Sequence, residues 1–339
     1  MRIGPERYHN RWHPALEPVA SVAPGEEVTF ETRDGLDGQL TRASTHADVA
    51  RLDLGRGHPL TGPVYVEGAE PGDVLEVELL AYEPASFGVT CVIPGFGLLH
   101  DLFPEPYLVR WEIAGGVARS PELPGVTLPQ EMFAGVIGVA PSPERLEAFR
   151  AREEALRLRG QPVADALPQA AVPASAADGL RTIPPRETGG NMDVRQLVAG
   201  SRLWLPVDVD GALFSIGDLH FAQGDGEVCG TAVEVEGAVT VRFAVHKAPA
   251  PPFPAFETPG TRERRSFATT GIPVRAGMDL DEAARAAVVG MVDHLERRHG
   301  FERAACYALC SVCVDLRISE AVDVPYPLVT ALLPLDVFE

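Results

Sequence analysis

Residues 69–80 read AEPGDVLEVELL, and this stretch decides which fold to expect. A Gly-centred turn and polar residues precede apolar residues at every second position, which is typical of a half-buried antiparallel strand. The same plan recurs at 22–32 (VAPGEEVTFET) and at 198–209 (VAGSRLWLPVDV). The pattern predicts a mostly β protein, built as multi-stranded sandwich or barrel-like subdomains with a few helices.

Three helices are expected. The segment 143–160 (PERLEAFRAREEALRLRG) has Ser142 as N-cap and Gly160 as a stop, so it predicts a helix near 143–159. Two more helices are expected in the C-terminal part, at 280–299 and from 302 to about 315. The first of these carries an apolar stripe at helical spacing, made by Leu280, Ala284, Ala287, Met291 and Leu295.

Composition shifts suggest three segments. An N-terminal β subdomain is expected over 1–142, and a helix plus an Ala/Pro-rich connection over 143–180. A C-terminal β subdomain over 181–339 would carry the polar site and two helices.

Charge and cysteine content exclude several classes of protein. The net charge of −19 argues against binding nucleic acid or anionic membranes. No apolar run approaches the roughly 20 residues of a membrane span, and the N-terminus lacks a signal-peptide core, so a cytoplasmic protein is expected. Five cysteines without a secretion signal argue against disulfides, and a helical face of Cys306, Cys310 and Cys313 is expected to pack in the core.

The segment 215–230 (SIGDLHFAQGDGEVCG) crowds polar groups between apolar strands. Period-two alternation points Asp218 and His220 to one face, and a tight QGDG turn would fold Glu227, at the start of the return strand, back towards His220. A carboxylate, an imidazole and a second carboxylate would then converge. That set suits a metal with nitrogen and oxygen ligands, or a general acid–base pair.

A second polar segment lies at 184–197 (PPRETGGNMDVRQL). Glu187, Asn191 and Asp193 flank a Gly–Gly pair that lets the backbone turn tightly or approach a ligand. Asn191 and Asp193 supply the oxygen ligands that hard cations prefer. Because one shared site would satisfy both polar segments, we expect them to meet in space.

Long motifs in the chain resemble the acetamidase/formamidase family: TGPVYVEGAEPGDVLEVELL (61–80), GVIGVAP (135–141), PPRETGGNMDVRQL and GALFSIGDLHFAQGDGEVCGTAVEVEG (211–237). The resemblance covers nearly the whole chain. It implies a mostly β fold, a cytoplasmic homo-oligomer (a dimer is favoured) and hydrolysis of short-chain amides to carboxylate and ammonia. It also suggests a divalent metal, zinc or calcium. His9 and His13 lie in YHNRWHP, which resembles the N-terminal segment of formamidases. They are therefore candidates to line the pocket, either of their own subunit or of a neighbouring one.

Roles follow from placing amide-hydrolysis chemistry on these motifs. A metal that activates water would be held by Asn191, Asp193 and His220, with Asp218 as a further ligand or as the partner that orients His220. Glu227 would carry the proton, with Glu187 as its alternative. Gln223 would hydrogen-bond the substrate amide. Asp225 is a further catalytic candidate, although turn chemistry alone also explains it.

Two other functions stay open. The chain could be a non-catalytic β-sandwich binding protein with a structural metal ion, or a metal-independent amidase with Cys229 as nucleophile. The second needs a lysine, and Lys247 is the only one in the sequence. The other histidines, His46, His58 and His100, lie in loop-like segments and are expected at the surface.

Overall fold

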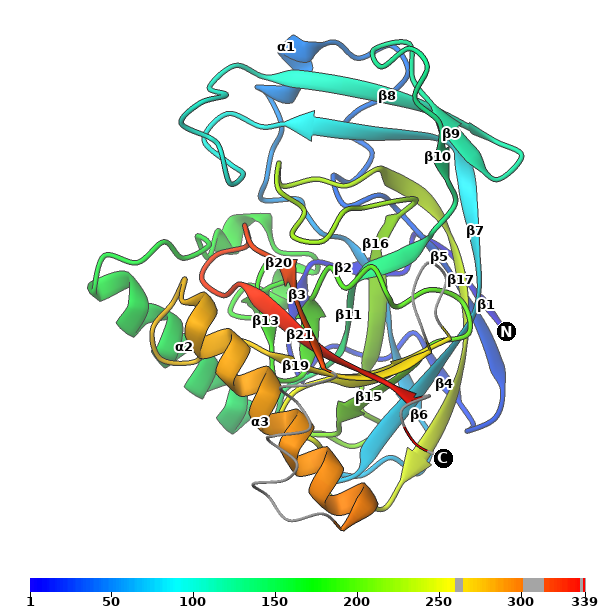
Figure 1. Ribbon diagram of the computed structural model, residues 1–339, viewed down its shortest axis with the longest axis vertical. Coiled ribbons are helices and arrows are strands. Elements are labelled where there is room, and N and C mark those ends of the chain that lie inside the picture. Colours follow the sequence, from blue (N-terminus) through cyan, green and yellow to red (C-terminus); the bar gives the residue numbers. More distant parts are fainter. Residues whose placement is uncertain (260–264, 301–313, 336–337, 339) are drawn as a thin grey trace.

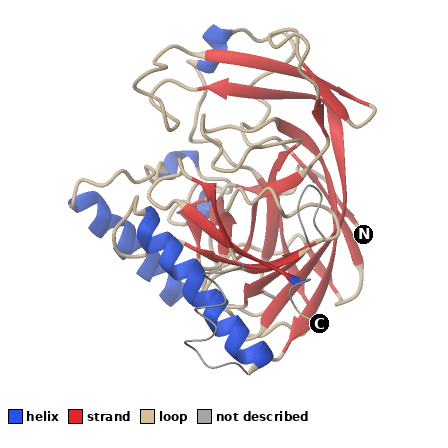
Figure 2. Ribbon diagram, viewed as in Figure 1, coloured by secondary structure: helices blue, strands red, loops and turns tan. Residues whose placement is uncertain are grey.

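The computed structural model describes residues 1–259, 265–300, 314–335 and 338. The fold is mostly β, with one 19-stranded, largely antiparallel sheet curled into a half-barrel (Figures 1 and 2). A separate pair, β3 with β12, completes the strands. The expectation of a mostly β fold is confirmed.

Before the second helix the strands are short, apart from β7. They are β1 (Arg2–Ile3), β2 (Tyr8–His9), β3 (Arg11–Trp12), β4 (Ala20–Val22), β5 (Glu27–Thr32), β6 (Leu60–Val66), β7 (Val74–Val92), β8 (Tyr107–Ala114), β9 (Val117–Arg119), β10 (Leu128–Pro129) and β11 (Phe133–Val139). The later strands are β12 (Leu180–Arg181), β13 (Pro185–Arg186), β14 (Gly189–Asn191), β15 (Arg202–Pro206), β16 (Phe214–His220), β17 (Glu234–His246), β18 (Ala255–Thr258), β19 (Ser266–Gly271), β20 (Asp315–Glu320) and β21 (Leu328–Pro334).

The described residues form three α-helices, α1 (His46–Val49), α2 (Pro143–Leu158) and α3 (Leu280–His299). The predictions for α2 and α3 are confirmed: α2 starts at the Ser142 cap, whose side chain accepts from the Arg145 amide at 3.2 Å. Of the predicted apolar stripe of α3, Ala284, Ala287, Met291 and Leu295 pack against β19 and β21, whereas Leu280 is exposed. No described helix is long and apolar enough to cross a membrane.

The helix expected from 302 to about 315 falls mostly on residues 301–313, outside the described residues, as do Cys306, Cys310 and Cys313. Its expected end is wrong, because Asp315 is the first residue of β20. β20 pairs along its length with β21. Hydrogen bonding between these two strands therefore determines the conformation from Asp315 on, although the sequence pattern there favours a helix.

The 19-residue strand β7 connects distant parts of the sheet, as Figure 1 shows. Its first five residues pair with β15, its far end pairs with β8, and β17 follows it for most of its length. The sheet therefore draws strands from both sides of the 143–180 segment. The three-segment division itself stays a prediction.

The Ala/Pro-rich connection, 161–179, is fastened to the body of the protein. It contains two 3₁₀ turns, Pro168–Ala170 and Ala174–Ala176. The fully buried guanidinium of Arg11 donates to the Leu167 carbonyl at 2.7 Å, and Arg181 donates to the Asp165 carbonyl at 2.7 Å. These bonds fix the connection as one wall of a cavity described below.

Three neighbouring strands carry the polar site. β11 pairs antiparallel with β16, placing Phe133 opposite His220, and also with β14, placing Val136 opposite Asn191. On the apolar side of these strands lies the main core, in which six phenylalanines are fully buried: Phe30, Phe133, Phe214, Phe221, Phe243 and Phe256.

Candidate functional site

In the interior of the protein, four carboxylates lie within 4 Å of one imidazole, that of His220, and two more, Glu320 and Asp323, lie beside this group. Each of these side chains has less than a tenth of its surface exposed: Asp193, Asp218, His220, Glu227, Glu234, Glu320 and Asp323. An isolated buried carboxylate is unfavourable by several kcal/mol, so such a group is expected only where the carboxylates bind something positive. We call these seven residues the acid cluster.

The Nε2 atom of His220 faces three of the carboxylates. It lies 3.3 Å from Glu234 Oε1, 3.4 Å from Asp218 Oδ1 and 3.9 Å from Glu227 Oε1. His220 ends β16 and Glu234 begins β17, directly opposite it in the ladder. The expected convergence of Asp218, His220 and Glu227 is therefore observed.

The two polar segments do meet, as expected. Asp193 Oδ1 lies 3.6 Å from His220 Nδ1. Asn191, at the end of β14, donates through Nδ2 to Asp323 Oδ2 and lines the same cavity as His220.

Gln223 fixes the orientation of the His220 ring. Its Nε2 donates to the Asp193 carbonyl at 3.0 Å, so its Oε1 is the atom that faces His220 Nδ1, at 2.7 Å. The Nδ1 atom must then carry a proton, so Nε2 is the ring nitrogen with which the neutral imidazole can bind a cation. Both ends of the Gln223 amide, expected to bind substrate, are thus occupied by protein groups.

The expected tight hairpin is wrong in detail. β16 and β17 are joined by the 13 residues 221–233, and Glu227 lies inside this connection rather than on the return strand. Directly after β16 and before β17, the Phe221 amide still donates to the Val233 carbonyl at 2.9 Å. Beyond that pair the chain bends at Gly226 and Gly230, both with positive φ, and this bend brings Glu227 back to His220.

Backbone strain concentrates at the acid cluster. Seven described residues other than glycine have positive φ, and three of them are Asp193, Asp218 and Glu227, at φ 47°, 54° and 42°. This conformation is uncommon for residues with a side chain and persists where the surroundings enforce it, as at ligand sites.

Two glycines make room for the carboxylates. A Cβ on Gly135 would lie 2.5 Å from Asp193 Oδ1, 2.8 Å from Asp218 Oδ2 and 2.8 Å from His220 Cε1. A Cβ on Gly35 would lie 2.0 Å from Asp218 Oδ1. Only glycine fits against the acid cluster at these two positions.

The electrostatics of the acid cluster call for a positive partner. Burial raises the pKa of Asp193, Glu227, Glu234, Glu320 and Asp323, and neighbouring carboxylates raise it further. For Asp218, burial is outweighed by His58 and His220, which lower its pKa. Burial would also lower the pKa of His220, yet Glu234 and Asp218 raise it well above the usual value.

The residues present fit a divalent cation. At this site, four buried oxygens have no hydrogen-bond partner among the described residues: Asn191 Oδ1, both Asp193 carboxylate oxygens and Glu320 Oε2. Two groups offer ligand atoms within 4.8 Å of one another, Asp193–His220–Glu227 and Asp218–His220–Glu234. Oxygen-rich sets with one imidazole suit calcium or zinc.

Two other catalytic candidates are bound elsewhere. Glu187 receives two hydrogen bonds from Arg152, at 2.7 and 3.0 Å. Asp225 is ion-paired with Arg195 at 3.2 Å and with Arg317 at 3.1 Å. Through these contacts with arginines, both carboxylates join separate segments of the chain.

Cys229 and Lys247 do not share a site. The Cys229 thiol donates to the Thr231 carbonyl at 3.4 Å, and Thr231 bonds Cys91 near the end of β7. Lys247 pairs with Asp73, just before β7 begins, at 2.7 Å. The thiol and the ammonium therefore lie towards opposite ends of a 19-residue strand.

Besides His220, the histidine that reaches the site is His58. It is half-buried rather than a surface residue, it lines the cavity beside the acid cluster, and its Nδ1 has no partner. His9 is buried and its Nε2 lies 2.7 Å from Ser215 Oγ, while His13 lies 3.2 Å from Asp178. Neither His9 nor His13 is among the residues that line the cavity within this chain.

Sequence reasoning missed Glu234, Glu320, Asp323 and His58. Glu234 looks like the exposed member of a period-two strand, and only its pairing with His220 places it inside. Glu320 and Asp323 stand three apart in SEAVD, where the Glu320 carboxylate accepts from the Asp323 amide. That spacing was the one feature of the sequence that could have indicated Glu320 and Asp323 as site residues.

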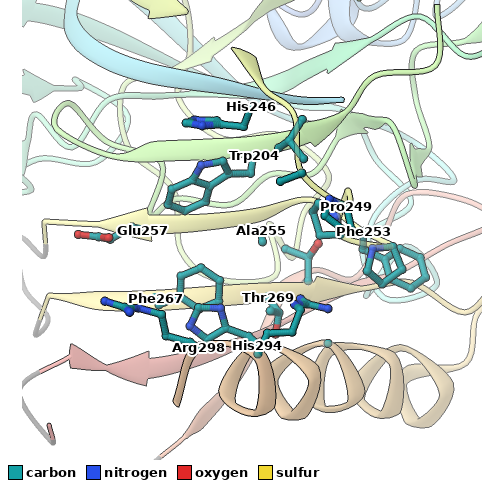
Figure 3. Close-up of a pocket in the computed structure, with 17 residues that line it drawn as sticks. Trp204, His246, Pro249, Phe253, Ala255, Glu257, Phe267, Thr269, His294 and Arg298 are labelled. Atoms are coloured by element: carbon teal, nitrogen blue, oxygen red, sulfur yellow. The ribbon is translucent and has the colours of Figure 1, made fainter. Parts of the chain in front are cut away.

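The acid cluster opens onto a cavity of about 310 Å³. A larger cavity of about 440 Å³ lies between α3 and strands β15, β18 and β19, as Figure 3 shows. Trp204, Phe267 and His294 line it, with the last two rings stacked 3.6 Å apart. Its one carboxylate among the described lining residues, Glu257, is paired with Arg265, so this cavity has no group of carboxylates like the acid cluster.

The fold and the site together define the class: a β half-barrel protein with a buried His/Asp/Glu site that fits a metal ion. Comparison with known proteins identifies the family. The model of the Acetamidase/Formamidase family matches residues 2–339. The chain is 39% identical to the acetamidase of Mycolicibacterium smegmatis, over 70% of this chain and 66% of that one, and 34% identical to the formamidase of Methylophilus methylotrophus, over 98% and 89%. The acetamidase structure from Bacillus halodurans superposes with a TM-score of 0.81 at 30% identity, covering 100% of this chain and 98% of that one.

The chain belongs to the acetamidase/formamidase family. It is a hydrolase that acts on amide carbon–nitrogen bonds.

Proposed function

We propose that this protein hydrolyses short-chain aliphatic amides, of the formamide and acetamide type, to carboxylate and ammonia. The observation that carries the proposal is the acid cluster, whose unpartnered buried oxygens adjoin a cavity of small-molecule size. Asn191 Oδ1, Asp193, Asp218 and His220 Nε2 would hold a divalent cation, zinc or calcium, with Glu234 beside them. Bound there, the cation would lower the pKa of a water and polarise the amide carbonyl.

Glu227 carries the proton in this scheme. Its carboxylate lies 3.9 Å from His220 Nε2 and lines the cavity, so it can take a proton from the attacking water and return it to the leaving nitrogen. Gln223 keeps the His220 ring in one tautomer. His58 has a free Nδ1 at the cavity wall and is available to hydrogen-bond the substrate amide.

The alternatives remain a binding protein with a structural ion and a Cys229 amidase. Against the second stand the Cys229–Thr231 bond and the distant, paired Lys247. We keep a homo-oligomer, with a dimer favoured, as part of the proposal, and sedimentation velocity measures it directly.

Ammonia release from formamide, acetamide and propionamide tests the proposal. Glu227→Gln should keep the metal and lose roughly 10²- to 10⁴-fold in kcat, the usual contribution of a general acid–base group. Glu147→Gln, exposed on α2, is the matched control and should match the wild type. A wild-type protein that holds its cation but releases no ammonia would favour the binding protein, and full activity of Glu227→Gln would remove Glu227 from the chemistry.

A further inference from the structure

The cavity beside the acid cluster is larger than formamide or acetamide requires. Taking about 30 Å³ per non-hydrogen atom, which is the share of one water in the liquid, its 310 Å³ hold about ten such atoms. An amide group, one water and one cation take about half of that space. Room remains for about five further carbon atoms.

The wall of this cavity outside the acid cluster is rich in apolar side chains. They come from separate segments of the chain and include Leu36, Leu54, Ile93, Phe96, Val163, Leu167, Ile183 and Val324. The Phe96 ring lies against Gly230, where an added Cβ would come within 2.4 Å of it. An aliphatic group in this cavity would therefore be surrounded by carbon rather than by water.

Other polar groups in the wall bond to the protein itself. Gln39 and Asp53 bond each other, with the Asp53 amide donating to Gln39 Oε1 at 2.9 Å and Gln39 Nε2 donating to the Asp53 carbonyl at 3.2 Å. Arg181 donates to two main-chain carbonyls, each at 2.7 Å. The Asp165 carboxylate pairs with Arg157 at 3.1 Å. Apart from the buried Arg181 Nε, which has no partner, these groups have partners within the protein and do not call for a polar acyl group.

We propose that, within this class of short-chain amides, the protein prefers primary amides with an aliphatic acyl group of four to six carbons over formamide and acetamide. The inference rests on the proposed function and names the substrate class of that same site. Each buried methylene should raise kcat/KM about fourfold, so pentanamide should exceed acetamide by about 60-fold.

The test is a series of kcat/KM values for acetamide, propionamide, butyramide and pentanamide. The variant Ile183→Phe places a ring where the acyl chain would lie, because Ile183 is half-buried at the cavity wall. It should lower kcat/KM for pentanamide at least tenfold more than kcat/KM for acetamide. Ile318→Phe, at a position on β20 that is 43% exposed, is the matched control and should follow the wild type.

Acetamide hydrolysis with kcat/KM flat or falling towards pentanamide would overturn this inference and leave the proposed function standing. An equal loss of Ile183→Phe on both amides would also overturn it, because the ring would then be acting on the whole site. If Ile183→Phe does not fold, the wild-type series decides alone. No hydrolysis of any of the four amides would overturn the proposed function and the inference with it.

Discussion

Gly135→Ala would disturb the acid cluster without removing any of its charges. The added Cβ would lie 2.5 Å from Asp193 Oδ1, whereas ordinary contact begins at 3.4 Å, so the carboxylate or the strand must move by about 0.9 Å. Gly135 lies within β11, which pairs on both sides and cannot yield freely. We expect about 1–3 kcal/mol lower free energy of unfolding, from overpacking.

A displacement of this size also predicts a functional loss. Misplacing reacting groups by about 1 Å costs on the order of 10²-fold in rate, so Gly135→Ala should lose about that much activity together with metal affinity. The matched control is Gly224→Ala, since a Cβ there meets nothing within 4 Å and the backbone φ is not positive. Urea unfolding, metal content and ammonia release from the two variants give the three readouts. A Gly135→Ala protein with wild-type metal content and rate would refute the crowded geometry that we describe.

Two further predictions concern Cys229 and His9. Cys229→Ser should keep its activity within about twofold, because the thiol bonds Thr231 and has no lysine nearby; a folded, metal-loaded but inactive variant would instead favour covalent catalysis. Burial lowers the pKa of His9 to about 4, so as pH falls from about 6.5 towards 4 the unfolded chain takes up the proton first, and the stability that neutral His9 contributes is lost. Urea unfolding measures the free energy of unfolding of the wild type relative to His9→Gln. Between pH 7.5 and pH 4.5 this difference should drop by about 2–3 kcal/mol. An unchanged difference would contradict a buried, neutral His9 imidazole.

The fold was predictable where local rules act alone. The Gly turn and alternation at 69–80 predict the start of β7, because side chains alternate with a period of two in any strand. Ser142 and Pro143 predict the start of α2 for a similarly local reason. The end of the predicted helix at Asp315 was wrong because pairing with β21, a long-range contact, sets that segment.

The site was predictable in part for the same reason. Asp218 and His220 share a strand, so their convergence could be inferred from spacing. Glu234 joins them through its strand pairing with His220, and Asp323 through a hydrogen bond from Asn191, and one sequence does not reveal such long-range contacts. The path of 221–233 depends on bends at Gly226 and Gly230. The letters QGDG are equally compatible with a tight turn, so the sequence did not distinguish the two paths.

Metal content and activity measured on the same sample test the central claim most directly. The protein as purified should contain at least one divalent cation per chain. Exhaustive chelation should abolish ammonia release, and re-addition of zinc or calcium should restore it, whereas His220→Ala should neither retain the metal nor regain activity. A metal-free protein that hydrolyses its amide at the full rate would contradict the account.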